Sequence, residues 1–393
     1  MRFLPWSFAW VLILTVSLRA QITIVKTAGT TLDLQGVSIP PTAEGVRFRQ
    51  TLEKNLARSG WITLVEKEAA WPVTGSFTPP ASAVIEIRSA GYRRTFSRRD
   101  GDSRRLAQEI ADALVESLTG RKGMARTRLA LAGNRTGHWE LYLCDSDGEN
   151  LQQITRDRSM ALYPYWSPDG SRLVFTSYRN RFPDLYLLTI GTWKLEPLAR
   201  FNGLNTGGAF SPDGQAVAVS LSFTGNPELY VLRPPVPGCR LFRLTQTPQA
   251  AETSPSWSPD GQRLVFVSDS SGSPQLYMMS ARGGERTRIP VSGTENVSPS
   301  WGPDGRIAFV TRRGGVYRIA IYSPDSGEVQ LVTDDDAQYE DPSWAPNGRH
   351  LACTRISGNR MTVVLLDTIT RRWIPFLDIE GSWRSPAWSP LLP

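Results

Sequence analysis

Few side chains in this sequence are placed for metal or acid–base chemistry. There are two histidines, His138 and His350, and neither has a cysteine, an aspartate or the other histidine at the spacing of a zinc site. The acidic run at residues 334–336 is more typical of a solvated turn than of a metal site. We therefore expect no bound metal and no cofactor.

Covalent catalysis also lacks its usual sequence signatures. No Gly-x-Ser-x-Gly nucleophile elbow and no glycine-rich phosphate loop occur in the chain. One acid–base set stays open, because Glu252, Glu340 and Asp341 precede repeated aromatic residues and would meet if those repeats surround one channel. A non-enzymatic binding protein is the leading interpretation, and an enzyme that uses these acids is the alternative.

The acids belong to a repeat that sets their positions. An aromatic residue begins each copy and is followed by a small residue, Pro, Asp or Asn, and Gly. The aromatic anchors are Trp166, Phe210, Trp257, Trp301, Trp344 and, in a shortened last copy, Trp388. They are 44, 47, 44, 43 and 44 residues apart. Pro-Asp-Gly favours a turn, and the β-rich runs around it predict four strands per repeat, which is typical of a β-propeller blade.

The two ends of the array predict that it closes into a ring. Residues 126–155 hold three strands of a blade without an anchor, and Trp388 is an anchor without a following blade. If the C-terminal strand completes the first blade, the fold is mainly β, with a six-bladed β-propeller of PD40/WD40-like repeats at residues 126–393. An open stack of repeats is the alternative. The repeated aspartates lie on successive blades, so we interpret them as turn formers and not as ligands of one ion.

The N-terminus and the composition indicate an exported protein. Residues 1–20 have the pattern of a signal peptide: Arg2, then an apolar stretch at 6–18 that is too short to span a bilayer, then a cleavage site after Ala20. An uncleaved anchor is the alternative. The net charge of +7 comes from scattered basic residues, apart from arginine pairs between 93 and 105, and favours a partner-facing or solvated surface over nucleic acid.

Cysteine usage gives no disulfide framework. The three cysteines, Cys144, Cys239 and Cys353, allow one bridge or three free thiols, and we favour the free thiols.

The segment before the repeats predicts a small α/β domain at residues 21–122. Apolar spacing predicts helices at 42–58, capped by Thr42, and at 103–118. Strands are expected at 22–25, 34–39, 62–65, 73–77, 84–87 and 92–96.

Signal peptide, α/β domain and Pro-Asp-Gly blades together resemble the TolB family, the periplasmic β-propeller component of the Tol–Pal system. The most specific match is Leu-Thr-Gly-Arg-Lys-Gly at 118–123, which leads into Thr-Arg-Leu-Ala at 127–130. The resemblance implies a non-enzymatic periplasmic adaptor that supports outer-membrane integrity and invagination during cell division. It implies two partners: a peptidoglycan-associated lipoprotein (Pal) at one channel mouth, and a TolA-like inner-membrane protein at the extreme N-terminal strand. We expect a monomer without a membrane span, and a scaffold for an unrelated partner is a further alternative.

Two partner sites follow from this resemblance. The first is the N-terminal strand, which is short and only partly apolar, as suits a segment that adds to a partner's sheet edge: Gln21, Ile22, Thr23, Ile24, Val25 and Lys26. A permanently docked strand predicts the same sequence. The second is the channel rim, formed by residues just before the anchors: Asn205, Thr206, Glu252, Thr253, Asn296, Glu340, Asp341 and Arg384. An ordinary hydrated rim is the alternative, and Leu204 stands where some family members have histidine.

Overall fold

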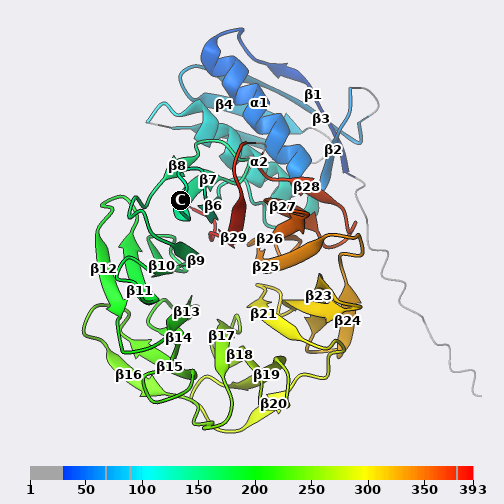
Figure 1. The fold of residues 1–393 in the computed structure, drawn as a ribbon. Helices are drawn as coiled ribbons and strands as arrows, with labels where there is room; N and C mark the ends of the chain where they lie inside the picture. Colours follow the sequence, from blue (N-terminus) through cyan, green and yellow to red (C-terminus); the bar gives the residue numbers. More distant parts are fainter. Residues whose placement is uncertain (1–29, 67–68, 88–90, 99, 378, 393) are drawn as a thin grey trace, which may run out of the picture.

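The computed structural model describes residues 30–66, 69–87, 91–98, 100–377 and 379–392 (Figure 1). The signal-like segment 1–20 and the predicted strand 21–26 lie outside the described residues. Of the helices in the described ranges, neither combines the length and the apolar character that crossing a bilayer requires.

The N-terminal domain is a five-stranded sheet covered by two helices (Figure 1). Its sheet order is β2-β1-β3-β4-β5, and its elements are β1 (Thr30–Ser38), α1 (Ala43–Arg58), β2 (Ile62–Leu64), β3 (Trp71–Thr78), β4 (Ser82–Ile87), β5 (Tyr92–Ser97) and α2 (Ser103–Thr119). Thr42 caps α1 by accepting from the Gly45 amide, and Gly120 ends α2 in the left-handed conformation. The elements predicted within the described residues are confirmed to within a few residues.

Six four-stranded sheets follow and form the propeller blades, which confirms the predicted fold class. Blade 1 combines β29 (Trp383–Trp388), β6 (Arg128–Gly133), β7 (Glu140–Asp145) and β8 (Gln152–Gln153). Blade 2 holds β9 (Ala161–Trp166), β10 (Arg172–Ser177), β11 (Asp184–Thr189) and β12 (Leu195–Ala199). Blade 3 holds β13 (Asn205–Phe210), β14 (Val217–Leu221), β15 (Glu228–Arg233) and β16 (Arg240–Arg243).

The other three blades repeat this order. Blade 4 holds β17 (Glu252–Trp257), β18 (Arg263–Ser268), β19 (Gln275–Ser280) and β20 (Arg286–Arg288). Blade 5 holds β21 (Asn296–Trp301), β22 (Ile307–Arg313), β23 (Val316–Ser323) and β24 (Glu328–Leu331). Blade 6 holds β25 (Gln338–Trp344), β26 (His350–Ser357), β27 (Arg360–Asp367) and β28 (Trp373–Pro375). The ring closes where β29 pairs antiparallel with β6, as the unmatched ends of the repeat array predicted.

Three of the aromatic anchors, Trp166, Trp257 and Trp344, donate a hydrogen bond to the preceding blade. The indole Nε1 of Trp166 donates to the Ala387 carbonyl at 3.1 Å, and that of Trp257 donates to the Ala209 carbonyl at 3.0 Å. The Pro-Asp-Gly segments are turns: the Asp169 carboxylate accepts from the Ser171 amide at 3.0 Å. This pattern recurs in the next two turns, so the repeated aspartates act as turn formers. All three cysteines are free thiols, two of them buried.

Polar contacts attach the N-terminal domain to blade 1. Arg104, at the start of α2, forms ion pairs with Asp145 at 3.2 Å and with the buried Asp147. Lys54 of α1 pairs with Glu149 at 3.0 Å. Figure 1 shows the domain beside blades 1 and 6, which leaves the other blades free around the channel.

Candidate functional site: one mouth of the propeller channel

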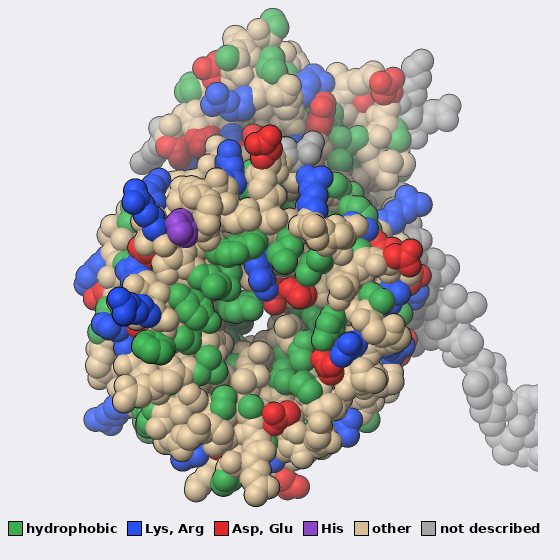
Figure 2. All heavy atoms as spheres, viewed as in Figure 1, with side chains coloured by type: hydrophobic (Ala, Val, Ile, Leu, Met, Phe, Trp, Pro, Cys, Tyr) green, Lys and Arg blue, Asp and Glu red, His purple; other side chains and the backbone are tan. Residues whose placement is uncertain are grey.

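One end of the central channel opens into a cavity of about 430 Å³ lined by the inner strands of all six blades. Figure 2 looks onto a mouth of the channel and shows the opening between the blades, with basic and acidic side chains next to each other beside it. The opposite end is a smaller hollow of about 290 Å³, lined by the aromatic anchors and the prolines that follow them. The first mouth therefore offers the more polar and more varied surface.

A backbone irregularity recurs in every inner strand at this mouth. Three residues before each anchor, φ is positive: 54° at Tyr163, 71° at Gly207, 53° at Ser254, 49° at Ser298, 51° at Asp341 and 49° at Ser385. The pairing register shifts at the same place in all six blades, which is the pattern of a β-bulge. The bulge residues line the cavity. We call these six positions the bulge ring.

Three of the predicted rim residues are buried, which corrects the expectation that they face a partner. Asn205, Glu252 and Asn296 are 0% exposed. They stand five residues before their anchors and are not among the residues that line the cavity. The expectation missed the bulge, and the recurring Ser-Pro, Asp-Pro or Tyr-Pro pair before the anchors was the signal that indicates it.

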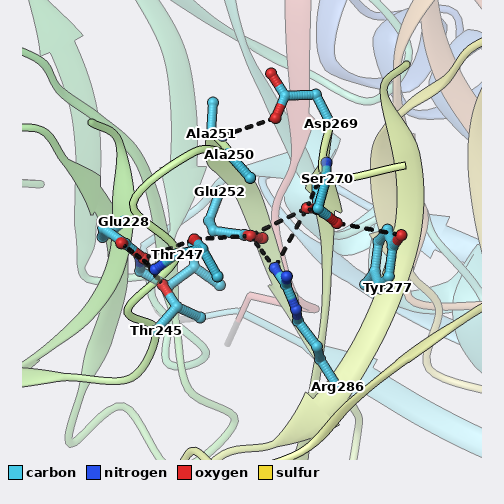
Figure 3. A network of polar contacts seen from close by, with 12 residues as sticks. Glu228, Thr245, Thr247, Ala250, Ala251, Glu252, Asp269, Ser270, Tyr277 and Arg286 are labelled. Atoms are coloured by element: carbon cyan, nitrogen blue, oxygen red, sulfur yellow. Dashed lines mark hydrogen bonds and ion pairs between the residues drawn. The ribbon is translucent and has the colours of Figure 1, made fainter. Parts of the chain in front are cut away.

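Glu252 belongs to a polar network inside blade 4 and the adjoining loop (Figure 3). Its carboxylate accepts from the hydroxyls of Thr247 and Ser268, each at 3.0 Å, and forms an ion pair with Arg286. Burial raises the pKa of Glu252 although Arg286 and the hydroxyls act against that shift. The residue therefore holds the loop before β17 in place.

Asn205 orders the rim loops of blades 2 and 3 in the same way. Its side-chain amide donates to the carbonyls of Phe201 at 2.8 Å and of Pro183 at 3.1 Å, and its oxygen accepts from the Phe201 amide at 2.9 Å. Asn296 has one such contact, to Gln275 at 2.7 Å. These buried residues therefore order the chain around the mouth through hydrogen bonds and do not line the cavity themselves.

The remaining predicted rim residues are at least partly accessible. Thr206 on blade 3 lines the cavity, and Thr253 on the neighbouring blade 4 is half-buried. Arg384 pairs with Glu340 across blades 1 and 6 at 3.4 Å. Asp341 lines the cavity and accepts from the Ser385 hydroxyl at 3.0 Å. Burial, reinforced by the nearby charge of Glu340, raises the pKa of Asp341 to about 6.

The three acids that the sequence left open as a catalytic set do not converge. Glu252 is tied to Arg286 inside blade 4, whereas Glu340 and Asp341 lie together on β25. His350 is buried, which lowers its pKa to about 4, and its Nδ1 lies 3.0 Å from Asn347 Nδ2. In the ranges that the structure describes, no group of three or more His, Cys, Asp or Glu is placed to hold a metal ion.

An exposed apolar patch flanks the mouth on blades 2 and 3. It consists of Met160, Tyr163, Phe182, Phe201 and Phe223, with exposures between 39% and 67%. The rings of Phe201 and Phe223 stack with centroids 4.9 Å apart. Figure 2 shows hydrophobic side chains spreading outward from the opening over these blades. Exposed apolar patches are found at protein-, membrane- and ligand-interaction sites of folded proteins. The sequence did not single out these residues, because Tyr163 lies on β9 and the other four lie in separate connections between strands.

The fold and this mouth define a class of protein: a closed β-propeller with an α/β domain, a cavity at one end of its channel and an exposed apolar patch beside that cavity. A family model described as the TolB beta propeller domain matches residues 115–392. The chain belongs to this TolB propeller family, which confirms the resemblance inferred from its sequence.

Curated relatives and a solved structure agree with this assignment. The chain is 35% identical to a TolB homolog of Chlorobaculum tepidum over 140 residues, or 36% of this chain and 32% of the relative. It is 37% identical to the Tol-Pal system protein TolB of Anaeromyxobacter dehalogenans over 155 residues, 39% of this chain and 35% of the relative. These matches thus span about a third of each relative's length. The crystal structure of TolB from Acinetobacter baumannii has a TM-score of 0.78 and 25% identity, covering 92% of this chain and 97% of that one.

Proposed function

We propose that the chain is a non-enzymatic periplasmic adaptor of the Tol–Pal system. In this proposal the channel mouth binds a peptidoglycan-associated lipoprotein, and residues 21–26 bind a TolA-like protein of the inner membrane. The adaptor supports outer-membrane integrity and the inward movement of the outer membrane at division. The relatives' names support the system, and the apolar patch beside the mouth is the single observation that carries the binding role.

The chemistry of the mouth favours a protein partner over a small substrate. Phe201 and Phe223 lie outside the cavity, where a folded partner reaches them, and buried aromatic side chains contribute most of the binding energy in many protein interfaces. The buried Asn205 fixes the loop that carries Phe201, so the surface is formed before a partner arrives. Thr206, Thr253, Glu340, Asp341 and Arg384 are the polar contacts that we propose for this interface.

The test is affinity capture from an envelope extract with the chain from residue 21 onward. Three forms are compared: this chain, the same chain without residues 21–26, and a Phe201→Ser/Phe223→Ser variant. Phe242→Ser is the matched control, because Phe242 is 49% exposed but lies on the outermost strand of blade 3.

We expect the intact chain and the control to retain both a peptidoglycan-associated lipoprotein and a TolA-like protein. The truncation loses only the TolA-like protein, and the double variant loses only the lipoprotein. Absence of both proteins from the intact chain's eluate contradicts the assignment.

A further inference from the structure

Five positions of the bulge ring carry a side chain in a backbone conformation that glycine adopts with the least strain. Non-glycine residues in the left-handed conformation cost free energy. Gly207 occupies this position in blade 3, so the fold accepts glycine there. The other five blades nevertheless carry a side chain, and these side chains line the cavity. We conclude that the side chains themselves serve a purpose in the channel.

The chemistry of the ring is that of a site for one positive charge. Its side chains are hydroxyls and a single carboxylate: Tyr163, Ser254, Ser298, Ser385 and Asp341. The carboxylate of Asp341 accepts from the neutral Ser385 hydroxyl and forms no ion pair with any residue in the described ranges, because the adjacent Arg384 is directed to Glu340. Hydroxyl oxygens around one carboxylate can accept the several hydrogen bonds that an ammonium group donates.

The residues next to the ring favour a cation on an apolar stem. Five blades place a proline directly after the bulge residue, and these prolines line the same cavity: Pro164, Pro255, Pro299, Pro342 and Pro386. Such an apolar collar packs against methylene groups, as the stem of a lysine side chain requires. A divalent metal ion fits less well, because Ca²⁺ and Mg²⁺ in protein sites favour more than one carboxylate.

We propose that the bulge ring binds the primary ammonium group of a lysine side chain that the protein partner inserts into the channel mouth. The identity of the partner rests on the proposed function, but the ammonium site itself does not. Asp341 supplies the charge, Ser298 and Ser385 on the two adjacent blades supply the other two acceptors for the three N–H donors, and the prolines contact the stem.

The probe for this site is n-butylammonium, titrated into the chain from residue 21 onward at pH 7.5 and low salt and followed by NMR chemical shifts. We expect saturable binding to the wild type and at least a tenfold weaker affinity in Asp341→Asn, which keeps the shape and removes the charge. The neutral n-butanol is the control ligand, and it should bind at least tenfold more weakly than n-butylammonium. Equal affinity of n-butylammonium for both proteins, or equal affinity of the two ligands for the wild type, overturns the proposal.

Ser298→Gly is a second variant that the fold tolerates by the precedent of Gly207. It should keep or raise the unfolding temperature while weakening n-butylammonium binding several-fold, and unchanged binding would argue against the ring. The two proposals fail separately. Butylammonium binding without capture of a lipoprotein leaves the ammonium site standing and removes the Pal assignment. Capture of a lipoprotein without butylammonium binding leaves the Pal assignment standing and removes the ammonium site.

Discussion

Arg349 of blade 6 lies over the indole ring of Trp61 in the N-terminal domain, with its Cζ 4.3 Å from the ring centroid. The Arg349 side chain is 2% exposed and also donates to both carboxylate oxygens of Asp367, at 3.0 and 2.6 Å. A Cβ on Gly60 would lie 2.8 Å from the same Cζ, so the chain before Trp61 approaches this guanidinium closely. One buried cation thus joins the two domains.

Arg349→Ala should therefore destabilise the whole protein. The substitution leaves Asp367 without its buried partner and removes the contact with Trp61, and loss of one member of a buried ion pair costs about 3 kcal/mol. Chemical denaturation followed by tryptophan fluorescence measures the free energy of unfolding. Arg360→Ala is the matched control, since Arg360 is exposed, and it should change stability by less than about 0.5 kcal/mol. Equal effects of the two variants would remove the special role of Arg349.

Asn205→Ala should weaken lipoprotein binding although Asn205 is buried and touches no partner. The variant loses the hydrogen bonds that hold the Phe201 loop, and unsatisfied buried groups cost about 1–3 kcal/mol each. Calorimetric titration with the lipoprotein's soluble domain should then show affinity reduced about tenfold for the folded protein. Asn296→Ala is the control, because it is equally buried but lies in blade 5, away from the apolar patch. A similar loss of affinity in both would point to general destabilisation.

The blades could be predicted from the sequence, but the direction of the rim side chains could not. The spacing of Trp166, Phe210 and the later anchors sets one blade per repeat, because each anchor ends an inner strand and each Pro-Asp-Gly starts the next turn. In a regular strand, every second side chain would then face the channel. The bulge breaks that alternation, so Ser254, one residue beyond the predicted Glu252 and Thr253, is the one that lines the cavity.

The polar network around Glu252 could not be predicted from the sequence either, because it joins residues that are far apart along the chain. Its partner Arg286 lies 34 residues further along the chain, on the outermost strand of the same blade. No local pattern distinguishes such an arginine from an exposed one. The apolar patch could not be predicted either, because Phe201 precedes β13 and Phe223 follows β14, so the two rings meet only when these strands pair.

Glu252→Gln should lower stability and leave partner binding unchanged. The amide oxygen can keep the three contacts, but the NH2 group takes the place of the carboxylate oxygen that has no hydrogen-bond partner, and Arg286 loses its counter-charge. These two costs exceed the relief of the burial that raises the Glu252 pKa, so we expect a net loss of about 1 kcal/mol in the free energy of unfolding. Thermal unfolding measures the loss, and lipoprotein capture is scored per folded molecule. Thr253→Ala, at the neighbouring half-buried position, should unfold like the wild type. A Glu252→Gln protein that unfolds normally yet fails to capture the lipoprotein would restore Glu252 as a contact residue.

Asp341→Asn should stabilise the protein at pH 7.5 and lose that advantage at pH 4. Burial and the charge of Glu340 raise the pKa of Asp341 to about 6 in the folded state, against about 3.9 in an unfolded chain. The folded state therefore binds more protons between these values, and the carboxyl's contribution to stability falls as pH rises through them. Because Asp341 is half-buried and lines the open cavity, solvent screens its charge, and we expect a gain of about 1 kcal/mol at pH 7.5, measured as unfolding temperature across pH.

Ser385→Ala tests how much the hydrogen bond from the Ser385 hydroxyl stabilises the ionised form of Asp341. The charge of Arg384 and the hydrogen bond from the Ser385 hydroxyl both favour the ionised carboxylate and lower its pKa. Removing the hydroxyl raises the pKa of Asp341 further, so this variant should be less stable than the wild type at pH 7.5 and similar to it at pH 4. The two substitutions thus act with opposite sign on the same carboxylate. If both shift stability equally at pH 4 and at pH 7.5, packing and not charge governs the bulge ring.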